Sequence, residues 1–177
     1  MMKKLSILLL TILLLCGCGN ASISNGKISI SGYKTLKISK EASEDENKLE
    51  DAIWEALVSC TTVKKIPEKD LEDKKEQLEA EYGALSYYKG LTAEEYILEK
   101  TGKSTEELAI WKLTKKYAIE LLAEKEKLAI DSERYQEMLE EAADDTDPQE
   151  YETMYGKEDL MEQFQEQEVL EFLMKYM

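Results

Sequence analysis

Signals that start and stop helices recur along most of this chain, and they constrain its fold more than any other feature of the sequence. Capping boxes, in which a Ser or Thr is followed three residues later by Glu, occur at Ser43, Thr92 and Ser104. The other expected starts are Pro67, Asp131 and Pro148, and the expected ends are Gly90, Gly102 and Gly156. The sequence therefore predicts an all-α body of several helices over residues 41–177.

Apolar residues recur at helical spacing between these signals, so each predicted helix has one face for the core. The expected helices cover about 43–63, 67–88, 92–101, 104–129, 131–143, 148–155 and 158–177. We expect Trp111, Leu139, Phe164 and Leu170 in the core, and Leu85 on the inward stripe of the second helix. Several stripes are narrow, which indicates that some helices project from the body.

The residues ahead of the helices have a different pattern. Lys27–Ser31 and Tyr33–Ile38 alternate polar and apolar side chains, with Gly32 between them, which predicts one or two short strands. An isolated pair of strands would be marginally stable unless it packs on the helical body. Gly19–Asn25 is small and polar and is expected to be a tether within residues 18–40.

The first residues are typical of an export signal. Lys3 and Lys4 precede an apolar run, Leu5–Leu15, which is too short to span a bilayer of about 30 Å. The segment Leu15–Cys18 resembles the lipobox of bacterial lipoproteins, which implies cleavage after residue 17 and diacylation of Cys18. Two or more acyl chains hold a protein stably on a membrane. The resemblance implies a lipid anchor on the extracytoplasmic face of the cell membrane; an ordinary cleaved signal and an uncleaved anchor remain alternatives.

Charge and composition exclude several classes of protein. The net charge is −15, which argues against nucleic-acid binding, and the chain has no histidine, the commonest general base and metal ligand. Residues 1–40 contain six lysines and no acid, so residues 41–177 carry −21. The basic stretch could be attracted to anionic lipid or could be a solvated linker. The acidic body is expected to favour partners rich in Lys and Arg.

Several segments, in this order, resemble the C-terminal chaperone domain of trigger factor. They are Trp54–Val58, Val63–Glu68, Gly90–Tyr96, Lys103–Leu108, Leu128–Glu133 and Tyr155–Lys157, with Gly32–Leu36 ahead of them. The resemblance covers about residues 30–177. The ribosome-docking domain is replaced by the lipoprotein signal, and the chain has no room for the isomerase domain. Parvulin-type foldase lipoproteins have a related helical part, but no parvulin domain is present.

The resemblance implies a chaperone body without catalysis, which holds unfolded or nascent exported polypeptides. Such a body needs no cofactor or metal, only adaptable apolar side chains such as Met and Tyr at a concave surface. The client-binding candidates are Tyr88, Met138, Tyr151, Met154, Tyr155 and Met161. For each of them, burial in the core is the alternative. An adaptor or scaffold that binds one specific protein is the alternative function, and the oligomeric state is left open.

Two further features are interpreted as structural. Asp144, Asp145 and Asp147 lack the ligand pattern of an EF-hand, so they are expected to form a solvated turn. Cys60 lies on an apolar helix face with no histidine to activate it, so a buried thiol is expected rather than a nucleophile.

Overall fold

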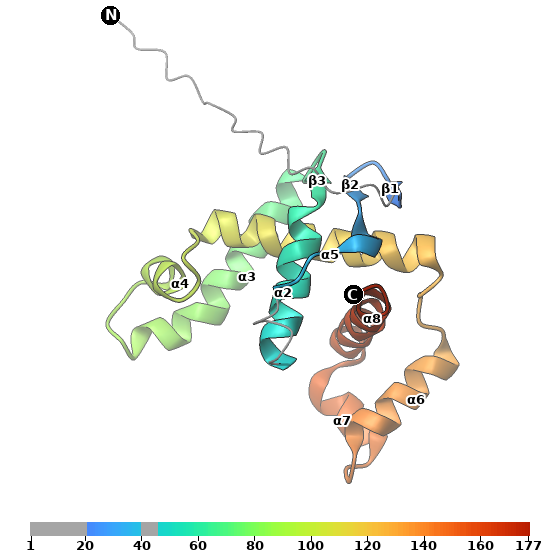
Figure 1. The fold of residues 1–177 in the computed structure, drawn as a ribbon. Coiled ribbons are helices and arrows are strands. Elements are labelled where there is room, and N and C mark those ends of the chain that lie inside the picture. Colours follow the sequence, from blue (N-terminus) through green and yellow to red (C-terminus); the bar gives the residue numbers. More distant parts are fainter. Residues whose placement is uncertain (1–20, 40–45) are drawn as a thin grey trace, which may run out of the picture.

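The protein is mostly helical, with a small sheet near the N-terminus. The computed structural model describes residues 21–39 and 46–177, so the predicted signal, Cys18 and the Ser43 capping box lie outside the described residues. The seven α-helices in the described residues are α2 (Glu46–Ser59), α3 (Glu68–Tyr87), α4 (Ala93–Thr101), α5 (Thr105–Glu126), α6 (Ser132–Ala143), α7 (Pro148–Tyr155) and α8 (Lys157–Met174). α5 is the longest of them, and the other parts of the fold are arranged around it (Figure 1).

The predicted starts of α4, α5, α6 and α7 are confirmed, and a nearby side chain or proline determines each of them. Thr92 and Ser104 each accept a hydrogen bond from the backbone N–H three residues later, and that residue's Glu side chain accepts one in return. The Asp131 side chain caps α6, and Pro148 occupies the first turn of α7. Gly102 ends α4 in the left-handed conformation, at φ 68°. These interactions pair backbone groups that a helix end otherwise leaves unbonded.

The small sheet corrects two expectations. Its strands β1 (Ser22–Ser24), β2 (Ile28–Ser31) and β3 (Thr61–Val63) pair antiparallel in the order β1-β2-β3. The segment expected as a tether therefore contains a strand, and the helix expected to reach Val63 stops at Ser59. β1 forms a local hairpin with β2, in which Ile23 is opposite Ile30, whereas β3 depends on long-range pairing, in which Ile28 is opposite Val63. Cys60, between α2 and β3, is half-buried, and its Sγ donates to the Leu57 carbonyl at 3.2 Å.

Of the one or two strands predicted over residues 27–38, the structure has one, β2, and Tyr33–Thr35 forms a 3-10 turn, η1. Gly32 precedes it at φ 78°, a left-handed conformation that glycine adopts without strain. The Thr35 N–H donates to the Gly32 carbonyl at 2.9 Å, which closes the turn. The chain thus changes direction after β2 and buries the Tyr33 ring against the body.

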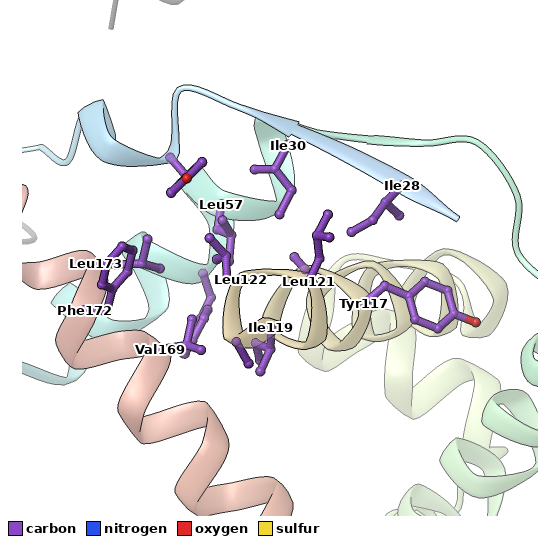
Figure 2. Close-up of a cluster of buried hydrophobic side chains, with 14 of the residues drawn as sticks. Ile28, Ile30, Leu57, Tyr117, Ile119, Leu121, Leu122, Val169, Phe172 and Leu173 are labelled. Carbon is purple, nitrogen blue, oxygen red and sulfur yellow. The ribbon is translucent and has the colours of Figure 1, made fainter. Parts of the chain in front are cut away.

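The main core lies where the sheet, α2 and the C-terminal half of α8 meet α5. Figure 2 shows Ile28 and Ile30 pointing from β2 toward Leu121 and Leu122 of α5. Val169, Phe172 and Leu173 of α8 belong to the same cluster, with Trp54 and Leu57 of α2. The short strands were expected to be stable only if they pack on the helical body, and β2 does pack on it.

Two arms extend from this core, each with a small cluster of its own. In the first arm, α3 and α4 pack on the start of α5 through Leu78, Ile97, Leu108 and Ala109. In the second, α6 packs on the start of α8 through Tyr135, Met138, Leu139, Leu160 and Phe164. α3 begins beside the sheet, and the ends of both arms lie on the other side of α5 (Figure 1). The expectation of projecting helices therefore agrees with the structure.

Candidate functional site

A groove of about 420 Å³ follows one face of α5, between α3 and α8. Its apolar lining comes from Trp111 and Ile119 of α5 and Met161 of α8. Trp111, which was expected in the core, is half-buried. The volume lies in the range of sites that hold small ligands, so the groove can take a few side chains of a bound polypeptide.

Lysines are concentrated in this groove although the whole chain carries a net charge of −15. The charged residues that line it are Lys74, Lys112, Lys115, Lys116, Glu120, Glu162 and Glu166. Four lysines against three glutamates make the groove slightly positive. Its charge is therefore opposite in sign to that of the body as a whole.

Two of these lysines form ion pairs that join α5 to α8. Lys115 contacts the Glu166 carboxylate, and Lys116 contacts the Glu162 carboxylate. The Lys115 ammonium also lies 4.3 Å from the centre of the Trp54 ring. These contacts hold α8 against α5 and neutralise the charge on that side of the groove.

The charge on the opposite side, near α3, is less well compensated. Lys74 donates a hydrogen bond to Gln77 Oε1 at 2.5 Å, and no carboxylate of the described chain forms an ion pair with it. Burial lowers the pKa of Lys74, and the nearby charges of Lys116 and Lys112 lower it further. Lys112 itself reaches Glu81 at 3.7 Å. An excess of positive charge is thus located at the α3 side of the groove.

A second hollow, of about 340 Å³, adjoins the groove and shares Lys74 and Lys116 with it. Here the Tyr117 hydroxyl donates to the Asp70 carboxylate, and Lys27 lies 3.5 Å from the same carboxylate. Burial and the hydrogen bond to Asp70 raise the pKa of the Tyr117 hydroxyl. The Lys27–Asp70 ion pair and the Tyr117–Asp70 hydrogen bond join α3 to α5 and to the residue that precedes β2.

The ends of both arms expose large apolar side chains. At the end of the first arm these are Leu85, Tyr87 and Tyr88 of α3 and the segment after it, with Leu98 of α4. Tyr88 is 86% exposed, and Leu85, expected to face inward, is 52% exposed. Exposed apolar side chains that gather in one place are typical of interaction surfaces.

The end of the second arm carries three of the predicted client-binding residues. Tyr151 and Tyr155 lie on α7 with their ring centres 4.6 Å apart, and Met154, beside them, is 65% exposed. Tyr155 is also exposed, whereas Tyr151 is half-buried against the cluster of the second arm.

The remaining two candidates have different environments. Met138 is only 3% exposed and belongs to the cluster of the second arm, so it is part of the core and not of the surface. Met161 is half-buried and lines the groove. The structure thus distributes the six candidates over the first arm, the second arm, the groove and the core, and does not unite them in one site.

Sequence reasoning missed the groove lysines. A signal for them was present, because Lys112, Lys115 and Lys116 are three and four residues apart and therefore share a face of one helix. Lys74 is distant in the sequence, and only the packing of α3 on α5 brings it to the same place.

The described residues contain neither a membrane-spanning helix nor a cluster of metal ligands. None of the helices in that part of the chain has the length and the hydropathy needed to cross a bilayer. Within the same residues, no group of three His, Cys, Asp or Glu side chains is arranged to hold a metal ion. Asp144, Asp145 and Asp147 lie exposed at the end of α6 and before α7, as expected for a solvated turn.

No protein-family model, curated protein or solved structure matches this chain. The resemblance to the trigger factor chaperone domain therefore stays a prediction from the sequence.

Proposed function

We propose that the protein is a lipid-anchored, extracytoplasmic holdase, which binds unfolded or nascent exported polypeptides without catalysis. The observation that carries this proposal is the exposure of large apolar side chains at the ends of two separate arms. The arms flank a groove whose lining combines Trp, Met and Ile with long, flexible lysines. Side chains of this kind adapt to many partners, which a holdase requires.

The proposal includes the membrane anchor and the fold family. The Leu15–Cys18 segment supports lipidation of Cys18, and the arrangement of two arms on a long central helix is compatible with a trigger-factor-like chaperone body. Membrane fractionation of a Cys18→Ala variant tests the anchor, since loss of the lipid should release the protein from the membrane fraction.

The exposed surface sets the expected strength of binding. A client that covers about 400 Å² of apolar surface gains roughly 10 kcal/mol, at about 25 cal/mol per Å². Association itself costs about 4–15 kcal/mol, which offsets most of this gain. Binding should therefore be weak and reversible, as is suitable for holding a chain that must later fold.

The test is the aggregation of a reduced, unfolded client protein, followed by light scattering. The full-length protein in non-ionic detergent should suppress aggregation at stoichiometric excess. A variant with Leu85→Ser, Tyr87→Ser and Tyr88→Ser should suppress it less, because the apolar end of the first arm is then removed. These side chains are exposed, so the variant should keep its helical circular dichroism.

The matched control replaces three exposed polar residues of the same helix: Glu72→Ser, Glu76→Ser and Glu79→Ser. It should suppress aggregation at least as well as the native chain. Absence of suppression by the native chain would contradict the holdase proposal. One saturable partner, together with no affinity for unfolded peptides, would instead indicate an adaptor.

A further inference from the structure

We infer that the groove between α3 and α8 binds acidic peptide segments in which an Asp or Glu lies next to an aromatic or aliphatic side chain. This inference rests on the proposed function and names the class of polypeptide that the groove selects. It differs from the expectation drawn from net charge alone, which favoured basic clients.

The positive charge on the α3 side of the groove is centred on Lys74. Lys74 forms no ion pair with a carboxylate of the described residues. Burial lowers its pKa, and repulsion from Lys116 and Lys112 lowers it further, while the more weakly acting Glu162 and Glu81 raise it. A carboxylate that enters beside Lys74 would relieve this repulsion. Lys74 is half-buried at the groove wall, so its interaction with a bound anion is screened less by solvent than that of an exposed lysine.

The groove also has an apolar lining beside its lysines. Trp111, Ile119 and Met161 line the same groove, within reach of a side chain adjacent to the bound carboxylate. A ligand that offered only charge would leave this lining uncovered, and a ligand that offered only apolar surface would leave Lys74 without a carboxylate partner. A peptide with both kinds of side chain next to each other satisfies both.

An anionic membrane fits the groove less well than a peptide. Glu120, Glu162 and Glu166 also line it, and they would repel a continuous negative surface. Residues 41–177 carry −21 in total, which opposes close approach of the whole body to anionic lipid. A peptide presents one or two carboxylates at chosen points and can place them away from these glutamates.

The test uses fluorescent peptides and the full-length protein in non-ionic detergent, with binding measured by anisotropy. One peptide contains a central Asp-Phe-Glu, the second has Asn-Phe-Gln at the same positions, and the third has Lys-Phe-Lys. The acidic peptide should bind most tightly, and its affinity should fall between 0.1 M and 1 M salt as the screening length shortens from about 10 Å to about 3 Å.

The groove variant is Lys74→Gln, and its matched control is Lys75→Gln, which removes the same charge from the next residue of α3 outside the groove. Lys74→Gln should weaken binding of the acidic peptide by about fivefold, the upper end of what one partly exposed ion pair contributes. It should leave the affinity for the neutral peptide unchanged. Lys75→Gln should change neither.

A second measurement localises the peptide without any substitution. The chain has two tryptophans, and Trp54 is buried while Trp111 lines the groove, so acrylamide should quench mainly Trp111. Bound acidic peptide should reduce this quenching. Unchanged quenching at saturating peptide would place the binding elsewhere and overturn the inference.

The outcomes separate the inference from the proposed function. Equal affinity for all three peptides would overturn the inference and leave the holdase proposal standing, whereas no binding of any peptide would count against both. Displacement of the acidic peptide by phosphatidylglycerol vesicles, but not by phosphatidylcholine vesicles, would assign the groove to lipid. A dimer that dissociates in Lys74→Gln would assign it to a second copy of the chain. Either result would overturn the inference.

Discussion

The packing of β2 on α5 leads to a quantitative prediction about stability. Ile30 of β2 is fully buried in the main core, whereas its partner across the sheet, Ile23 of β1, is only partly buried. Ile30→Ala and Ile23→Ala remove the same three carbon atoms from neighbouring strands. The pair of variants therefore compares the same chemical change at a buried position and at an edge position.

The expected cost follows from the number of buried atoms. Three buried carbons contribute about 2.4 kcal/mol at about 0.8 kcal/mol each, and the cavity left behind raises the cost for Ile30→Ala to about 3–4 kcal/mol. Ile23→Ala should cost about 1 kcal/mol, because solvent already reaches its side chain. Since whole domains have about 5–15 kcal/mol of stability, the first loss is large.

Urea unfolding measures both values. Trp54 is buried in the same cluster, so its fluorescence should report the loss of the main core, and far-ultraviolet circular dichroism should report the helices. Coincident transitions would support two-state analysis. A cost below about 1 kcal/mol for Ile30→Ala, or equal costs for the two variants, would refute the argument that β2 is a structural part of the core.

Two further predictions concern a helix end and a titrating pair. Ser104→Ala should lower the free energy of unfolding by about 1 kcal/mol, because the N–H of Glu107 loses its capping partner, and Ser104→Thr should restore most of the loss in the same urea assay. The hydrogen bond from Tyr33 and the ion pair with Lys34 lower the pKa of Glu126 from its usual 4.5. The ionised Glu126 carboxylate therefore stabilises the folded state fully above pH 4.5. This stabilisation is lost as the pH falls through the lowered pKa of the folded state. The difference in urea midpoint between the native chain and Glu126→Gln should therefore be larger at pH 7 than at pH 3, and a constant difference would contradict this assignment.

Local chemistry explains which parts of the fold could be predicted. The starts of α4, α5, α6 and α7 depend on side chains within a few residues of each helix end, so the sequence alone predicts them. β3 depends on β2, a partner far away in the chain, and was therefore interpreted as the end of a helix. One local signal for β1 was overlooked: Asn25 and Gly26 are residue types that favour turns, and the Lys27 and Ile28 N–H groups donate to Asn25 Oδ1 at 2.8 and 2.9 Å in the turn before β2.

The candidate site was harder to predict because residue type does not determine exposure. Met138 and Met154 have the same side chain, but one faces the cluster of the second arm and the other faces solvent. Helical spacing places Met138 with Tyr135 and Leu139 on the apolar stripe of α6, whereas the short helix α7, which carries Met154, has no buried residue. Net charge was also a poor guide to the groove, because α3 and α5 bring positive side chains together on a body that is negative overall.

The position of β1 in the chain limits how far the body can stand from a lipid at Cys18, if that residue is acylated as proposed. Ser22 is already part of the sheet, and the four residue steps from Cys18 span at most about 14 Å when fully extended. A free linker of all residues from 18 to 40 would reach roughly 75 Å at the same rise per residue. The lipid would therefore keep the sheet close to the headgroups, while the ends of both arms, on the other side of α5, would face away from the bilayer. A chain leaving the membrane would meet the protein within the first few tens of ångströms of its path.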